Sequence, residues 1–70
     1  MYRNLAAEMG RKGIRKKDIA KLLGVRYATV IEKTNGKRRF YLDEAVKIKE
    51  AFFPDLSLEY LFDTDETKSA

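Results

Sequence analysis

A single glycine, Gly24, separates two short segments of helical period near the middle of the chain. In the segment before it, Ile19, Ala20 and Leu23 recur at the spacing that places side chains on one face of a helix. The small side chain of Ala20 also lets a second helix backbone come close. Glycine readily adopts the left-handed conformation that ends many helices, because it has no Cβ to clash. We therefore expect a helix that stops at Leu23 and a sharp turn directly after it.

The segment after the glycine is expected to form a second short helix. The predicted ranges of the two helices are Lys16 to Leu23 and Tyr27 to Thr34. Val25 would fill the corner between them, and Val30 would face the first helix across the turn. Two short helices joined by such a tight, glycine-containing turn form a helix-turn-helix.

The rest of the chain predicts three more helices, which gives an all-α fold: a compact bundle of about five short helices. Their expected ranges are Tyr2 to Arg11, Leu42 to Phe52 and Leu58 to Phe62. Gly10, Lys12 and Gly13 are expected to break the first, Pro54 stops the second, and Ser57 can cap the third. The residues expected to face the core from the first two are Leu5, Met9, Leu42, Ala45, Ile48 and Phe52. We expect one domain over residues 1–62 and a frayed acidic tail over 63–70.

The composition excludes several classes of function. A chain of 70 residues is long enough for one small core and too short for a catalytic domain with a deep pocket. It has no cysteine and no histidine, so we expect no disulfide, no metal site and no cofactor. No set of nucleophile and base and no phosphate-binding loop is present, so we do not expect an enzyme. No apolar run reaches the length of a membrane span, and we expect a soluble cytosolic protein of a cell without a nucleus.

Charge is sorted by sign along the sequence. Residues 11–39 contain 11 lysines and arginines against two acidic residues, a net charge of +9. Residues 40–70 contain three lysines against eight acidic residues, a net charge of −5. The basic part coincides with the predicted helix-turn-helix, as expected of a surface that binds a phosphate backbone.

The ordered set of residues in this region resembles the DNA-binding unit of the lambda-repressor-like family, which includes phage repressors, Cro proteins and xenobiotic-response-element regulators. The family pattern L-A-x-x-L-G-V-S is matched by Ile19, Ala20, Leu23, Gly24 and Val25. The elements that follow it in the family are matched by Thr29, Val30, Asn35, Gly36, Lys37, Leu42, Lys47 and Ile48. The resemblance covers residues 5–62, and its specificity lies in the order of the elements. It implies a sequence-specific transcriptional regulator that binds double-stranded DNA, at a roughly palindromic operator.

The resemblance also implies which residues contact DNA. Those expected to reach base edges in the major groove are Arg26, Tyr27, Ala28, Thr29, Ile31 and Glu32. Those expected to contact phosphates are Arg15, Lys16, Lys17, Lys33, Asn35, Lys37, Arg38 and Arg39. The family forms its two-fold dimer contact near the last helix, so a weak homodimer is expected here through Phe53, Leu56, Tyr60 and Phe62.

Two positions depart from the family pattern. Arg15 and Arg26 stand at the expected starts of the two helices, where the family usually has threonine or serine. An arginine side chain cannot accept a hydrogen bond from the free backbone N–H groups of a helix start. We therefore consider two explanations: DNA phosphates supply the missing acceptors, or the positions are tolerated defects.

Two other classes of function remain open on the sequence alone. The chain can be a helical protein-interaction module, such as an antitoxin-like or anti-repressor subunit, that uses its aromatic C-terminal part. It can also be a non-specific nucleic-acid or RNA binder that uses the same basic segment.

Overall fold

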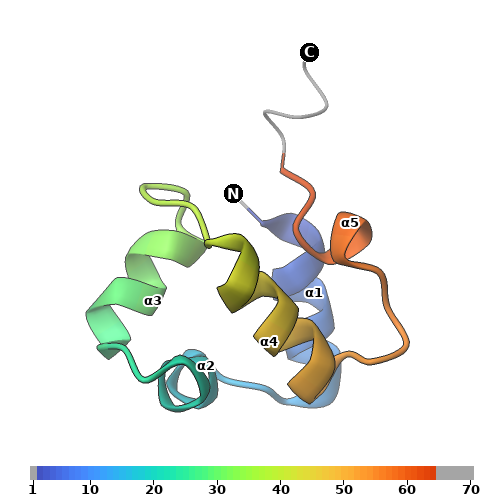
Figure 1. Cartoon of the computed structure of the whole chain (residues 1–70), viewed down its shortest axis with the longest axis horizontal. Helices are drawn as coiled ribbons and strands as arrows, with labels where there is room; N and C mark the ends of the chain where they lie inside the picture. The colour runs from blue at the N-terminus through green and yellow to red at the C-terminus, as the bar shows by residue number, and fades with distance from the viewer. Residues whose placement is uncertain (1, 65–70) are drawn as a thin grey trace.

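This computed structural model describes residues 2–64, which contain five α-helices and no strand (Figure 1). The helices are α1 (Arg3–Lys12), α2 (Lys16–Leu23), α3 (Tyr27–Thr34), α4 (Leu42–Phe52) and α5 (Leu58–Leu61). The predicted all-α bundle is confirmed. Of the expected tail, residues 65–70 lie outside the described residues.

The turn between α2 and α3 has the geometry expected from Gly24. This glycine ends α2 in the left-handed conformation with a φ of 68°, and the next backbone N–H, that of Val25, donates to the carbonyl of Ala20 over 3.1 Å. Ile19 from α2 and Val30 from α3 are both fully buried. The two helices contact each other, and α2 also contacts α4. Packing of this apolar pair therefore holds α3 against the rest of the bundle.

The first helix has the predicted length but begins and ends one residue later than predicted. Gly10 lies inside α1 and does not break it, while Gly13 ends it with a φ of 69°. Ile14 then donates its N–H to the carbonyl of Met9 over 2.9 Å, which closes the last turn. Glycine in a helix lowers stability without preventing the helix, and burial of Leu5 and Met9 outweighs that cost.

The apolar stripe of α4 is shifted relative to the prediction. Ala45 and Ile48 are buried as expected, but Leu42 is 74% exposed, so its predicted place in the core is wrong. Leu42 lies on the first turn of α4, and Phe40 in the preceding loop packs against the core. At the other end of α4, Phe52 is only half-buried and the adjacent Phe53 is fully buried.

Three aromatic rings join the two ends of the described chain. The ring of Tyr2 lies 5.4 Å from that of Phe40 and 5.6 Å from that of Phe62, and the last two are 5.6 Å apart. The tilted and edge-on arrangements are those that aromatic quadrupoles favour. The Tyr2 hydroxyl also accepts the backbone N–H of Phe40 over 3.2 Å. This cluster links the start of α1, the α3–α4 loop and the residue after α5.

Substitution of Gly24 and of Gly10 by alanine should change the stability of the fold in opposite directions. Gly24→Ala places a Cβ at a φ of 68°, and we expect a loss of about 1–2 kcal/mol in the free energy of unfolding. Gly10→Ala should instead raise it by about 0.5–1 kcal/mol, because an added Cβ there meets no atom within 4 Å. Urea unfolding followed by circular dichroism measures both. Equal effects of the two substitutions would contradict the assigned backbone conformations.

Candidate nucleic-acid interface

The outer surface of α3 carries most of the residues predicted to contact bases. Tyr27 is 48% exposed, and Arg26, Ala28 and Glu32 are also exposed. Ile31 is half-buried, as is Thr29. The helix therefore presents its N-terminal turn and one edge of its second turn to solvent, while Val30 anchors the opposite side.

The starts of α2 and α3 lack a side-chain cap, as the arginines at these positions predicted. Arg15 and Arg26 are the N-cap residues, both with extended backbones, and neither side chain accepts a hydrogen bond from its helix. Asp18 has a role at this helix start that the sequence did not suggest. Its carboxylate, in the first turn of α2, reaches back and accepts the backbone N–H of the N-cap residue Arg15 over 2.8 Å. This hydrogen bond stabilises the start of α2. At the start of α3 no side chain of the described residues plays this part. The backbone N–H groups at the start of α3 therefore have fewer hydrogen-bond acceptors than those at the start of α2.

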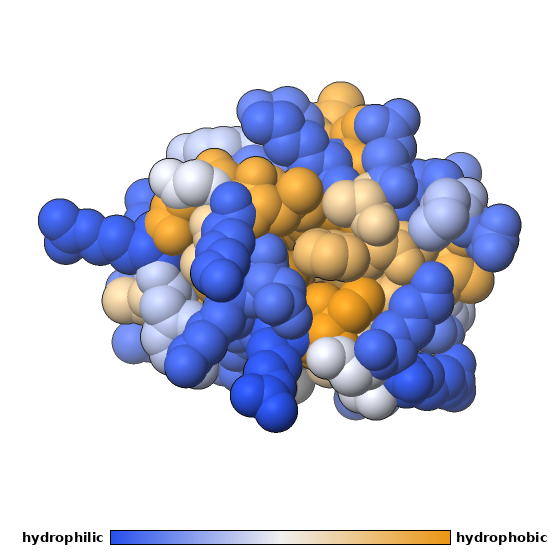
Figure 2. Space-filling view, turned by 90° about the horizontal axis from the view of Figure 1, so that it is seen from below, coloured by the Kyte–Doolittle hydropathy of each residue, from blue (hydrophilic) through white to orange (hydrophobic). Residues whose placement is uncertain are grey.

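Exposed cations lie at the starts of α2 and α3 and in the loop after α3. Arg15, Lys17, Arg26 and Lys37 are exposed, and no ion pair within residues 2–64 involves them. Among the other predicted phosphate contacts, Arg39 and Asn35 are exposed and Lys16 is half-buried. The surface is not uniformly charged. Seen from below, on the side where α2 lies, apolar surface occupies the middle of the face and polar side chains lie around it (Figure 2).

Glu32 has a partner that the sequence did not suggest. Its carboxylate lies 3.6 Å from the guanidinium of Arg38, in the loop after α3. Both side chains are about half exposed, 47% and 57%, so the pair is weak and screened by salt. The backbone strengthens the same connection, because the Lys37 N–H donates to the carbonyl of Glu32 over 3.0 Å. The loop cations are thus held close to the exposed edge of α3.

Lys33 is a correction to the predicted phosphate contacts. Its side chain is 5% exposed and donates to the carboxylate of Glu44 at the start of α4. Its ammonium also lies 4.5 Å from the ring centroid of Tyr41 and 5.7 Å from that of Phe40. A charge removed from water in this way needs its partner, so Lys33 is part of the core and cannot reach a phosphate.

Thr34 closes α3 with its side chain. Its hydroxyl donates to the carbonyls of Val30 and Ile31 over 2.9 and 3.0 Å. This bonding competes with continuation of the helix, and α3 ends at Thr34 as predicted. Gly36 follows with a φ of 89°, which turns the chain toward the loop cations.

The predicted dimer residues are mostly used inside the protomer. Phe53 is fully buried, so its assignment to a dimer contact is wrong. Phe62 is half-buried in the cluster with Tyr2 and Phe40, and Leu56 packs partly against the core. Of the four predicted dimer residues, Tyr60 is the most exposed, at 38%.

Tyr60 connects α5 to α1. Its hydroxyl donates to Glu8 over 2.7 Å, and its carbonyl accepts from the Asn4 amide over 2.7 Å. The hydrogen bond to the Glu8 carboxylate, together with desolvation, raises the pKa of Tyr60 above its usual value. Because the folded-state pKa is raised, this contribution to stability is complete at neutral pH and is lost only as the pH rises through that value.

The described residues contain no group of acidic side chains that could hold a metal ion. No helix in the same part of the chain is long and apolar enough to cross a membrane. Comparisons of the chain with protein-family models, curated proteins and solved structures found no match.

Removing one partner of the Lys33–Glu44 pair should destabilise the fold strongly. We expect Lys33→Ala to lower the free energy of unfolding by about 3 kcal/mol, because it leaves the largely buried carboxylate of Glu44 without its ion partner. Arg38→Ala is the matched control: it breaks the exposed pair with Glu32, and a change below about 1 kcal/mol is expected. Chemical denaturation measures both. Similar losses in the two variants would show that the buried pair contributes no more to the free energy of unfolding than the exposed pair does.

Proposed function

We propose that this protein is a sequence-specific double-stranded DNA-binding regulator of transcription, of the lambda-repressor-like type. In this proposal α2 and α3 act as a helix-turn-helix, and α3 lies in the major groove. The mechanism is binding at an operator, which blocks or recruits other proteins, with no chemical step.

One observation carries the proposal: exposed cations lie at the start of α2 and in the α3–α4 loop, and both segments lie beside residues in the second half or at the end of α3. The start of α2 contributes Arg15 and Lys17, and the α3–α4 loop contributes Lys37 and Arg38. Cations beside a helix that lies in the major groove can contact the phosphates that border the groove. The start of α3, which has no side-chain cap, adds backbone N–H groups and the positive end of a helix dipole.

The exposed residues of α3 can discriminate bases through different groups. The guanidinium of Arg26 suits guanine, the methyl of Ala28 suits the thymine methyl group, and a carboxylate such as that of Glu32 accepts from a cytosine amino group. Glu32 contacts Arg38 in the free protein over 3.6 Å. DNA binding would break this pair, because Arg38 would move to a phosphate. Glu32 would then contribute to the choice of base and not to the strength of binding.

The proposal includes two protomers on a roughly palindromic operator. Their α3 helices would occupy successive major grooves about 34 Å apart. With Phe53 buried, contacts near Tyr60 and Leu56 remain the candidates for the dimer surface. The exposed surface there is small, so we expect association mainly on DNA.

Selection from random duplex DNA tests the proposal. We expect a palindromic consensus, and binding to it that weakens about 10³-fold or more between 50 and 200 mM salt. Sedimentation on the selected duplex should show two protomers. Salt-sensitive binding without a consensus would instead support a non-specific nucleic-acid binder, and absence of DNA binding would favour the protein-interaction module.

The two uncapped helix starts give a second test. The double variant Arg15→Thr and Arg26→Ser supplies hydroxyl caps, and we expect each cap to add about 0.5–2 kcal/mol to the free energy of unfolding. The same variant should bind the selected DNA more weakly, because it loses two cations and offers its own acceptors to the N–H groups. Lys47→Gln, an exposed charge change on α4, is the control. Unchanged DNA affinity in the double variant would refute phosphate capping of these helices.

A further inference from the structure

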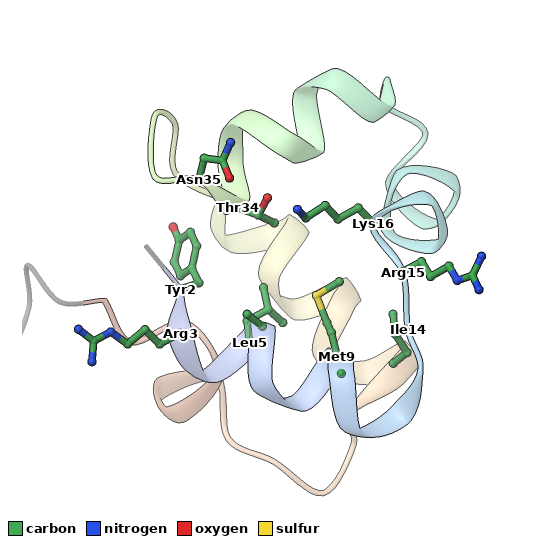
Figure 3. Close-up of a pocket in the computed structure, with 11 residues that line it drawn as sticks. Tyr2, Arg3, Leu5, Met9, Ile14, Arg15, Lys16, Thr34 and Asn35 are labelled. Atoms are coloured by element: carbon green, nitrogen blue, oxygen red, sulfur yellow. The ribbon is translucent and has the colours of Figure 1, made fainter.

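A groove of about 520 Å³ opens between α1, the start of α2 and the end of α3 (Figure 3). Its apolar floor comes from Leu5 and Met9 on α1 and from Ile14 after it. Thr34 and Asn35 line the opposite side, where the hydroxyl of Tyr2 also lies. Volumes in this range are typical of sites for small organic molecules.

The charges that line the groove have one sign. Arg3, Arg15 and Lys16 are among its lining residues, and no acidic residue is. The side chain of Lys16 extends across the groove toward Thr34, whereas that of Arg15 points outward (Figure 3). Lys16 also begins α2, whose first N–H groups receive no side-chain cap. An anion over the apolar floor would therefore meet an ammonium group and a positive helix end together.

Gly10 is a second, independent indication that this space is used. It lies within α1 and lines the groove, and a Cβ built on it meets no atom within 4 Å. Its backbone has no positive φ that would require glycine. Glycine at a helix interior costs about 0.5–1 kcal/mol relative to alanine, and no contact in the fold explains it. What glycine does here is leave the groove open.

We propose that the groove binds a small amphipathic anion, an alkyl or aryl carboxylate, with its apolar body on Leu5, Met9 and Ile14 and its carboxylate at Lys16. We propose further that this ligand competes with DNA. The second part rests on the proposed function, because Arg15, Lys16 and Asn35 are shared between the groove and the predicted phosphate contacts. An anion held at Lys16 occupies one phosphate-binding cation and lowers the local positive potential, so DNA affinity falls.

The binding site is tested without DNA. Decanoate, below its micelle concentration, is titrated into the ¹⁵N-labelled protein, with decanol as the uncharged counterpart. We expect saturable shifts confined to amides around the groove, and binding of decanol at least tenfold weaker. Gly10→Leu, which fills the groove, should weaken decanoate binding at least tenfold, and Lys16→Gln roughly fivefold. Lys21→Gln removes an equal charge at the other end of α2, outside the groove, and should leave binding unchanged.

Several results would overturn the site. Equal binding of decanol and decanoate would remove the role of the charge. Full decanoate affinity in a folded Gly10→Leu protein would place the ligand elsewhere, and shifts spread over the whole chain or absent altogether would rule out a defined site. The competition is then tested on the selected operator: decanoate should raise the apparent Kd for DNA in the wild type and not in Gly10→Leu. Groove binding without any effect on DNA affinity would refute the competition alone, and failure to bind DNA at all would refute only the proposed function.

Discussion

The ion pair between Lys33 and Glu44 is the constraint on which the arrangement of the outer surface depends. It joins the last turn of α3 to the first turn of α4, and the same carboxylate accepts the backbone N–H of Tyr41 over 2.9 Å. The rings of Tyr41 and Phe40 cover the ammonium. A buried charge tolerates few alternative positions, because moving away from its partner leaves it desolvated and alone. The pair therefore fixes both ends of the loop that carries the exposed cations.

The basic residues of this chain fall into two groups: those bonded to other residues of the protomer and those exposed to solvent. Arg11 pairs with Glu8 over 2.6 Å, and Lys12 donates to the carbonyl of Phe52 over 2.7 Å. The first pair lies within α1, whereas Lys12 and Lys33 each connect α4 to another helix. Those at the start of α2, the start of α3 and the α3–α4 loop face solvent. A count of charge along the sequence thus overstates the positive surface offered to a partner, and only the contacts distinguish the two groups.

The sequence predicted the elements better than their contacts. The boundaries of α2 and α3 follow from local causes, namely helical periodicity and the conformational freedom of Gly24, and these were predicted correctly. The burial of Lys33 and Phe53 and the exposure of Leu42 depend on which segments meet in three dimensions. Lysine at a helix end next to a basic loop gave no sign that a glutamate 11 residues later would bury it. Likewise, Phe52 and Phe53 are chemically equal neighbours, and only the direction in which the chain leaves α4 decides which one enters the core.

The aromatic cluster of Tyr2, Phe40 and Phe62 has a consequence for the topology. Because the rings of Tyr2 and Phe62 are 5.6 Å apart, the two ends of the folded domain lie side by side. In Figure 1 both leave on the side away from α2. A short peptide could therefore join them, and the chain could be opened instead in the exposed segment at Pro54 and Asp55. Such a permuted chain would keep the same contacts between helices, with its two ends in the segment between α4 and α5.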